Sequence, residues 1–467
     1  MKFVNNSKNT VNLIDLDIDV PYLEDLSSQY ISLDDAKKSN GFRRMVILGL
    51  FEITEHNNTL FERDLIKRQK KMLNFKKENK QEIQNNTETP KNKIEVKLRG
   101  SFLELGGYAK VNRNLTKGLS DLGVNVAVEP TSTRNNQLTE EELNDLMKYN
   151  KQVSKNAIVI ESVIPTFGSG SFGRYRILYT TIESETIPQQ FIDIVKTYNE
   201  VWVVSDFCKE ILLKYGINDR PIYVIPNTVD NYLYIEDGDK YKFKPELKDF
   251  IFISVFGWSY RKGYDVLLKS YLKEFSGDDN VSLLIVSRNH LGFHKNDVIR
   301  DEISKFIEKY GGNNPAHIAR CSKFIPEKIM PSIYRACDAF VLFTRGESYG
   351  IPYVESSLCG LPVIGTNCTG QTMFLKKDNS FLLDVDDIQP LEQGLMQVHY
   401  WDNQMFPVLR SEETIKSAGK LMRYVYENYD EAKEKNLQLS RYISENYNIE
   451  RVAKLAKKRL GEIWRKL

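Results

Sequence analysis

The pattern of apolar and polar positions changes near residue 94 of this 467-residue chain. Before that point the sequence is rich in Asn, Lys and Asp, and residues 76–93 are polar enough to form a linker. After it, short apolar runs alternate with segments of helical periodicity, which is typical of doubly wound α/β domains. The pattern therefore predicts an N-terminal extension over residues 1–93, followed by an α/β region.

Two series of elements are predicted within this region. The first has strands at residues 94–98, 124–128, 157–160, 176–181, 201–204 and 222–225, and helices at 109–122, 187–198 and 206–215. The second has strands at 251–256, 281–286, near 317, and at 338–343, 361–365 and 381–383, and helices at 264–275, 297–310 and 327–335. A helical tail starts at residue 412, and a last helix covers 449–467. We place the boundary between the two domains at residue 235, which gives domains of 94–235 and 236–448.

The segment TRGESYGIPYVESSLCGLPVIGT, residues 344–366, joins two predicted strands through a turn and a short helix. Pro352 near the start of that helix and Gly360 just past its end are typical helix boundaries. Ligands bind parallel sheets at the carboxyl ends of the strands, and a helix N-terminus suits a phosphate. The carboxylates of Glu347 and Glu355 would repel a bound phosphate, so we expect them to hold something else, such as sugar hydroxyls. The segment therefore predicts a site for a phosphate and a polyol.

A second set of candidate residues lies in GWSYRKG, residues 257–263, directly after a predicted strand. Arg261 and Lys262 are adjacent cations at the carboxyl end of that strand, where they suit a diphosphate. Cations fixed there would stabilise negative charge that develops on such a group. The alternative is a solvated loop pair.

The spacing of Glu347, Gly350, Pro352 and Glu355, in ESYGIPYVE followed by CGLPVIGT, resembles the E-x7-E signature of retaining family 4 glycosyltransferases. The resemblance covers about residues 95–467. It implies the GT-B fold: two Rossmann-like domains facing across a cleft, with helix 449–467 returning to the first domain. It also implies that the first domain holds the acceptor and the second holds a nucleotide-diphosphate sugar.

In terms of this family, Glu347, Arg261 and Lys262 are the catalytic candidates. Glu347 would hold sugar hydroxyls, and Glu355 would hold the donor, commonly its ribose. The implied donor site comprises Gly257, Arg261, Lys262, Glu347, Ser348, Tyr349, Gly350 and Glu355. The phrase IPNTVD, residues 225–230, resembles the family's interdomain hinge.

Three further residues are candidates for contact with the acceptor or with the donor phosphate. Gly106 and Gly107 resemble the family's glycine loop, which lies against the donor phosphate or the acceptor, although they also suit a simple turn. Lys110 and Arg113 follow them and could add charge for an acidic acceptor, but we interpret both as solvated surface. Glu183 stands where many relatives have a His; it is a candidate acceptor contact, with Glu185 as its competitor.

No metal or cofactor site is predicted. The acidic pairs Asp384/Asp386 and Asp15/Asp17/Asp19 fit a DxD pattern, but we interpret the first as structural and the second as part of the atypical extension. Arg261 and Lys262 would take over the role of a divalent cation. The five cysteines have no CxxC spacing and are expected to be buried reduced thiols.

Composition adds limits on partners. A net charge of +2 argues against nucleic acid as a partner. We expect no signal peptide and no membrane span, hence a cytoplasmic protein. Residues 61–80 are a basic helical segment with two open interpretations: peripheral contact with the inner face of a membrane, or docking on this protein or a partner.

The sequence-based interpretation is a retaining, metal-independent transfer of a sugar, a hexose being the family's commonest, to a glycan, lipid-linked or protein acceptor. A noncatalytic subunit or scaffold that binds partners through its extension is the alternative. A phosphorylase or epimerase lacks support because no candidate lysine or histidine site is evident. A dehydrogenase is disfavoured because no G-x-G-x-x-G follows a first strand.

Overall fold

The computed structural model describes residues 93–131, 138–165, 173–288, 297–323, 325–391 and 403–467. It also describes the backbone of five short strands further upstream: β1 (Lys2–Asn5), β2 (Val11–Leu13), β3 (Ile18–Val20), β4 (Gln29–Tyr30) and β5 (Phe51–Glu55). The basic segment 61–80 lies outside the described residues, so its two interpretations stay open.

The first large sheet has six strands in the order β11-β10-β9-β8-β6-β7. They are β6 (Glu95–Gly100), β7 (Asn125–Pro130), β8 (Ile158–Ser162), β9 (Arg176–Thr180), β10 (Glu200–Val203) and β11 (Ile222–Val224). The strands β8 to β11 pair in parallel in sequence order, and β6 pairs in parallel with β7. Four helices lie between these strands in the sequence: α4 (Gly107–Asp121), α5 (Glu140–Met147), α6 (Gln189–Val195) and α7 (Asp206–Lys214).

The second large sheet also has six parallel strands, in the order β14-β13-β12-β15-β16-β17. They are β12 (Phe250–Gly257), β13 (Val281–Arg288), β14 (His317–Cys321), β15 (Ala339–Leu342), β16 (Val363–Thr366) and β17 (Phe381–Leu383). The elements between them are η1 (Tyr260–Lys262), α8 (Tyr264–Glu274), α9 (Asp297–Tyr310), α10 (Met330–Arg335), α11 (Ile351–Leu358) and η2 (Gly370–Met373). The predicted fold class, two doubly wound Rossmann-like sheets, is confirmed.

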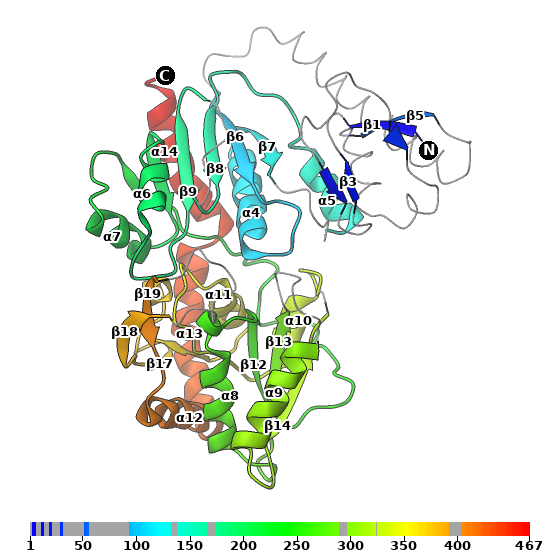
Figure 1. The fold of residues 1–467 in the computed structure, drawn as a ribbon, viewed down its shortest axis with the longest axis vertical. Helices are drawn as coiled ribbons and strands as arrows, with labels where there is room; N and C mark the ends of the chain where they lie inside the picture. Colours follow the sequence, from blue (N-terminus) through cyan, green and yellow to red (C-terminus); the bar gives the residue numbers. More distant parts are fainter. Residues whose placement is uncertain are drawn as a thin grey trace. The chain divides into compact units, whose positions relative to one another are not determined.

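The chain ends in three helices: α12 (Glu412–Glu427), α13 (Tyr429–Asn446) and α14 (Ile449–Trp464). Helix α12 packs along α8, as Figure 1 shows. Each of α12 and α14 buries one apolar stripe, so the predicted amphipathic pattern determines which face packs. No helix in the part of the chain that the structure describes is long and apolar enough to span a membrane.

The chain divides into two compact units, residues 1–116 with 123–157, and residues 117–122 with 158–467. This division does not test the predicted domain boundaries, which stay predictions. Within the second unit, Arg459 of α14 pairs with Glu200 of β10 at 2.6 Å, and Lys457 donates to the Leu122 carbonyl at 2.8 Å. The last helix is thereby joined to the segment that follows α4 and to a strand of the first sheet.

Predicted and observed elements differ at their ends by three residues or fewer. Helix α5 had no prediction, and neither had the antiparallel pair of β18 (Asp387–Pro390) with β19 (Met405–Val408). The local sequence disfavours the pair, because Pro390 and Pro407 lie within its strands. Packing compensates: the side chain of Phe406 is fully buried against Leu391 and Tyr260.

Candidate functional site

The first part of the site is the turn between β15 and α11, residues 343–350. Gly350 has φ +91° and precedes α11, so the chain reverses there in a conformation that favours glycine. Helix α11 has Pro352 in its first turn, and Gly360 with φ +87° follows its end, as the sequence predicted. The turn lies at the carboxyl end of β15, in the middle of the second sheet.

The second part is η1, which follows β12 and carries Arg261 and Lys262. Strand β12 pairs with β15, so the two loops emerge side by side. Gly263 closes η1 with φ +67°, and a Cβ there would lie 1.8 Å from the carbonyl oxygen of Phe343. Only glycine allows this approach, which holds the cation loop against the turn before α11.

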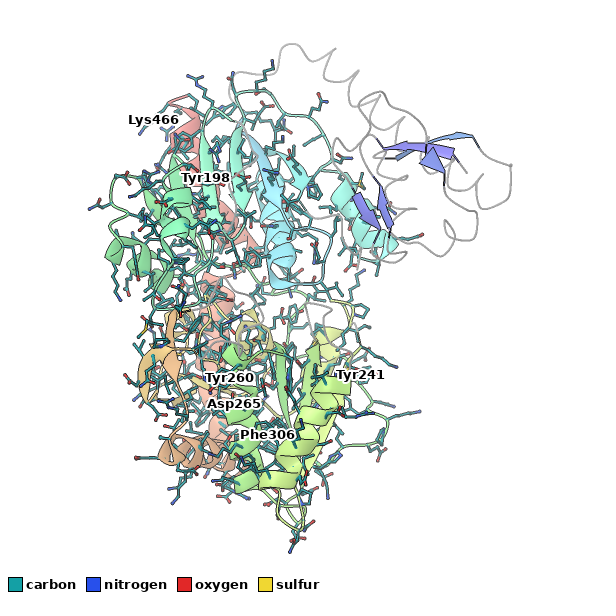
Figure 2. All side chains as sticks on the ribbon, viewed as in Figure 1. Tyr198, Tyr241, Tyr260, Asp265, Phe306 and Lys466 are labelled. Atoms are coloured by element: carbon teal, nitrogen blue, oxygen red, sulfur yellow. The ribbon has the colours of Figure 1, made fainter. Side chains whose placement is uncertain are left out.

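A buried arginine that the sequence did not mark fixes these two loops together. The guanidinium of Arg345 donates to both carboxylate oxygens of Asp265 at 2.7 and 2.8 Å and lies 3.8 Å from the ring centroid of Tyr260. It also donates to the carbonyls of Tyr260 and Leu409 at 2.8 and 3.2 Å. Figure 2 labels Tyr260 and Asp265 near the start of α8. Burial alone would lower the pKa of Arg345, but the bonds to Asp265 outweigh it and raise the pKa above its usual value.

Both predicted cations are paired with carboxylates. Lys262 donates a hydrogen bond to the carboxylate of Glu347. Burial lowers the pKa of Lys262, and the charge of the neighbouring Arg261 lowers it further, although Glu347 acts in the opposite direction. Arg261 donates to the carbonyl of Gly346 and pairs with Glu183 at 3.1 Å between Nη2 and Oε2. The structure therefore brings all three catalytic candidates together, and it adds Glu183 to them.

Glu355 is buried in α11 and is held by two tyrosines. The hydroxyl of Tyr334, in α10, donates to Oε2 of Glu355 at 3.1 Å, and Tyr234 also hydrogen-bonds this carboxylate. Burial and then the charge of Glu355 raise the pKa of both phenols well above the usual value. Neither tyrosine was predicted to take part, because they stand about 20 and 120 residues from Glu355 in the sequence.

The other donor-site candidates line the same loops. Gly257 is the last residue of β12, and Ser348 is buried. The carbonyl of Ser348 lies where a Cβ at Gly370 would be, at 1.9 Å, so η2 packs tightly under the turn. The buried ring of Tyr349 packs on Phe374 and Tyr447.

The glycine loop belongs to the first compact unit. Gly107 is the first residue of α4, and a Cβ at Gly106 would meet no atom within 4 Å. The interpretation of Lys110 and Arg113 as solvated surface is wrong. Lys110 is only 6% exposed, and Arg113 donates to the carbonyls of Phe102 and Glu104 at 2.7 and 2.8 Å. The reason is that Arg113 lies on the side of α4 that faces the preceding loop.

The acidic pair near the last strand is engaged in structural contacts. Asp384 accepts from Asn367 and Lys377. Asp386 is partly desolvated, but donors from Arg410, Ser411 and Thr414 at the start of α12 lower its pKa to about 2. In the described part of the chain, no group of three or more His, Cys, Asp or Glu is arranged to hold a metal.

Comparison with known proteins places this geometry in a family context. Residues 248–399, which contain η1 and the turn before α11, match the family model described as Glycosyl transferases group 1. A D-inositol 3-phosphate glycosyltransferase from Jonesia denitrificans is 30% identical over 97 residues, which are 20% of this chain and 23% of that protein. A mannosylfructose-phosphate synthase from Agrobacterium fabrum is 24% identical over 160 residues, 32% of this chain and 34% of that protein. The chain thus spans 34% or less of the length of these curated relatives.

Solved structures agree on the fold. A sucrose-phosphate synthase from Thermosynechococcus elongatus covers 80% of this chain and 100% of its own, with a TM-score of 0.58 and 12% identity. The HepE protein of Anabaena, solved with UDP and glucose, covers 79% of this chain and 100% of its own, with a TM-score of 0.55 and 12% identity. The predicted glycosyltransferase resemblance and GT-B fold are confirmed. The assignment to family 4 stays a prediction.

Proposed function

We propose that this chain, a GT-B fold with a group 1 glycosyl transferase segment, transfers a sugar from a nucleotide-diphosphate donor with retention of configuration and without a metal ion. The observation that supports this most is the meeting of Arg261, Lys262 and Glu347 at the carboxyl ends of two adjacent strands. The two cations would bind the diphosphate of a sugar nucleotide, and the carboxylate of Glu347 would bind its sugar.

The diphosphate would bind to Arg261 and Lys262. Arg261 offers a planar fork of donors and Lys262 a point charge, so together they can hold several phosphate oxygens. When the glycosidic bond breaks, negative charge grows on the leaving phosphate. Cations already in position stabilise that charge without reorganisation, and this lowers the barrier. Both side chains are mostly buried, which strengthens the effect.

The sugar would lie against Glu347, whose carboxylate accepts hydrogen bonds from sugar hydroxyls. Glu355 lies eight residues further along the chain, in α11, and would accept a hydrogen bond from the ribose of the nucleotide. In a front-face reaction, the departing phosphate oxygen takes the proton of the acceptor hydroxyl. This route suits a site in which many groups donate hydrogen bonds to the phosphate. The same arrangement supports the proposed metal independence, because the two cations would supply positive charge to the diphosphate in place of a divalent ion.

A hexose is the proposed sugar, and a glycan, a lipid-linked molecule or a protein is the proposed acceptor. One relative is named as a D-inositol 3-phosphate glycosyltransferase and another as a mannosylfructose-phosphate synthase. The HepE protein was solved with UDP and glucose. UDP is therefore the first nucleotide to test. A cytoplasmic location is also proposed.

Thermal unfolding in EDTA with UDP, GDP, ADP or dTDP tests the donor site. A ligand at about 100 times its dissociation constant should stabilise the wild type by about 2.7 kcal/mol. Arg261→Ala should lose this shift, whereas Arg300→Ala, a control on the exposed surface of α9, should keep it. A shift that appears only with added Mg²⁺ contradicts metal independence. If none of the four nucleotides shifts the wild type, the donor site is refuted and the scaffold interpretation takes its place.

A further inference from the structure

An ion pair between Arg261 and Glu183 joins two loops of the second compact unit. Arg261 follows β12, and Glu183 lies in the loop after β9. The two side chains are 12% and 18% exposed, so water screens their attraction only partly. The pair is therefore a defined contact rather than a chance meeting of two solvated side chains.

The loop that carries Glu183 is held firmly against the turn before α11 and against the start of β19. A Cβ at Gly346 would lie 2.0 Å from the carbonyl oxygen of Glu183, so the two backbones touch. The next residues are also fixed, since the N–H of Glu185 donates to the Met405 carbonyl at 2.8 Å and Thr186 bonds Gln404 at 2.9 Å. The carboxylate of Glu183 is thus directed at the guanidinium that the donor diphosphate would need.

The charges of the two ion pairs in the site balance without a donor. Arg261 and Lys262 supply two positive charges, and Glu183 and Glu347 supply two negative charges. A diphosphate adds at least two further negative charges in a poorly hydrated place. It must compete with Glu183 for Arg261, and it repels a carboxylate that stays there.

We propose that Glu183 occupies in the free protein the place on Arg261 that the donor diphosphate takes, and that the displaced carboxylate then accepts a hydrogen bond from the acceptor hydroxyl. This inference rests on the proposed function. A carboxylate that is released only when the donor is bound makes productive acceptor binding follow donor binding. Glu183 therefore weakens donor binding and supports transfer, and these two effects have opposite signs.

The substitution Glu183→Gln keeps the size of the side chain and removes its charge. The test measures, by titration calorimetry, the affinity for whichever of UDP, GDP, ADP and dTDP stabilises the wild type. We expect the variant to bind that nucleotide about tenfold more tightly, as for loss of one close like charge. Glu210→Gln makes the same charge change on the exposed side of α7 and should leave the affinity unchanged.

The outcomes separate the two ideas. Tighter binding by Glu183→Gln alone supports the inference, and a damaged fold cannot produce it. If Glu183→Gln binds the nucleotide no more tightly than the wild type does, the inference is overturned. The proposed function still stands in that case, because the wild type binds the nucleotide. A wild type that binds none of the four nucleotides refutes the proposed function itself. Once an acceptor is known, a KM for that acceptor that does not rise in Glu183→Gln also overturns the role of the released carboxylate.

Discussion

Replacing Arg345 by Met tests whether its buried guanidinium holds the site together. The side chain is 1% exposed and donates to Asp265, Tyr260 and Leu409. Met has a similar length but leaves the carboxylate and two carbonyl oxygens without this donor. Breaking a buried ion pair costs about 3–5 kcal/mol. Asp265 is 24% exposed and keeps some water, so we expect the lower end, about 3 kcal/mol.

Urea unfolding at pH 7 measures this loss. Arg410→Met is the matched control: its side chain is exposed, so the free energy of unfolding should change by less than about 0.5 kcal/mol. The double variant Arg345→Met with Asp265→Leu removes both charges and should recover most of the stability, because no uncompensated carboxylate remains. A loss below about 1 kcal/mol in the single variant would refute the reasoning. A double variant that loses the sum of the two single losses would also refute it.

Three further predictions concern the same part of the chain. Gly263→Ala should lose roughly 3 kcal/mol or more in urea unfolding, because the new Cβ meets the Phe343 carbonyl at a positive φ; an unchanged midpoint contradicts this. Tyr334→Phe should lose about 1.5–2 kcal/mol, since the carboxylate of Glu355 loses one donor, and a thermal shift against wild type checks it. Asp386→Asn should cost about 1 kcal/mol at pH 7, after allowance for exposure. The folded-state pKa of Asp386 is about 2 against an ordinary 3.8, so this difference should be complete above 3.8 and vanish as the pH falls towards 2; a difference that persists at low pH argues against it.

The sequence alone determined the order of the elements and the positions where chemistry can occur. Apolar runs between amphipathic segments predicted both sheets, since strands covered on both faces must be apolar throughout. Pro352 and Gly360 marked the limits of α11 because their backbone preferences act locally. The position of Arg261 and Lys262 directly after a strand placed them at a carboxyl edge before any contact was known.

Only the tertiary structure decided which of these groups meet. The strand order sets β12 beside β15, and this brings Lys262 to Glu347 across 85 residues of sequence. The same order explains the pair of Arg345 with Asp265, 80 residues apart. Local periodicity does not encode sheet order, because one alternating pattern is compatible with several orders.

Packing also decided the elements that local preference opposes. The strands β18 and β19 contain Pro390 and Pro407, and they form because Phe406 gains a fully buried position. Similarly, Arg113 is drawn to the carbonyls of Phe102 and Glu104, although its charge suggested a solvated side chain. In both cases a tertiary contact outweighs a weaker local preference: the low strand propensity of proline in the first, and the hydration of a charged side chain in the second. The sequence therefore defines which groups are available, and the packing of the sheets decides what each one touches.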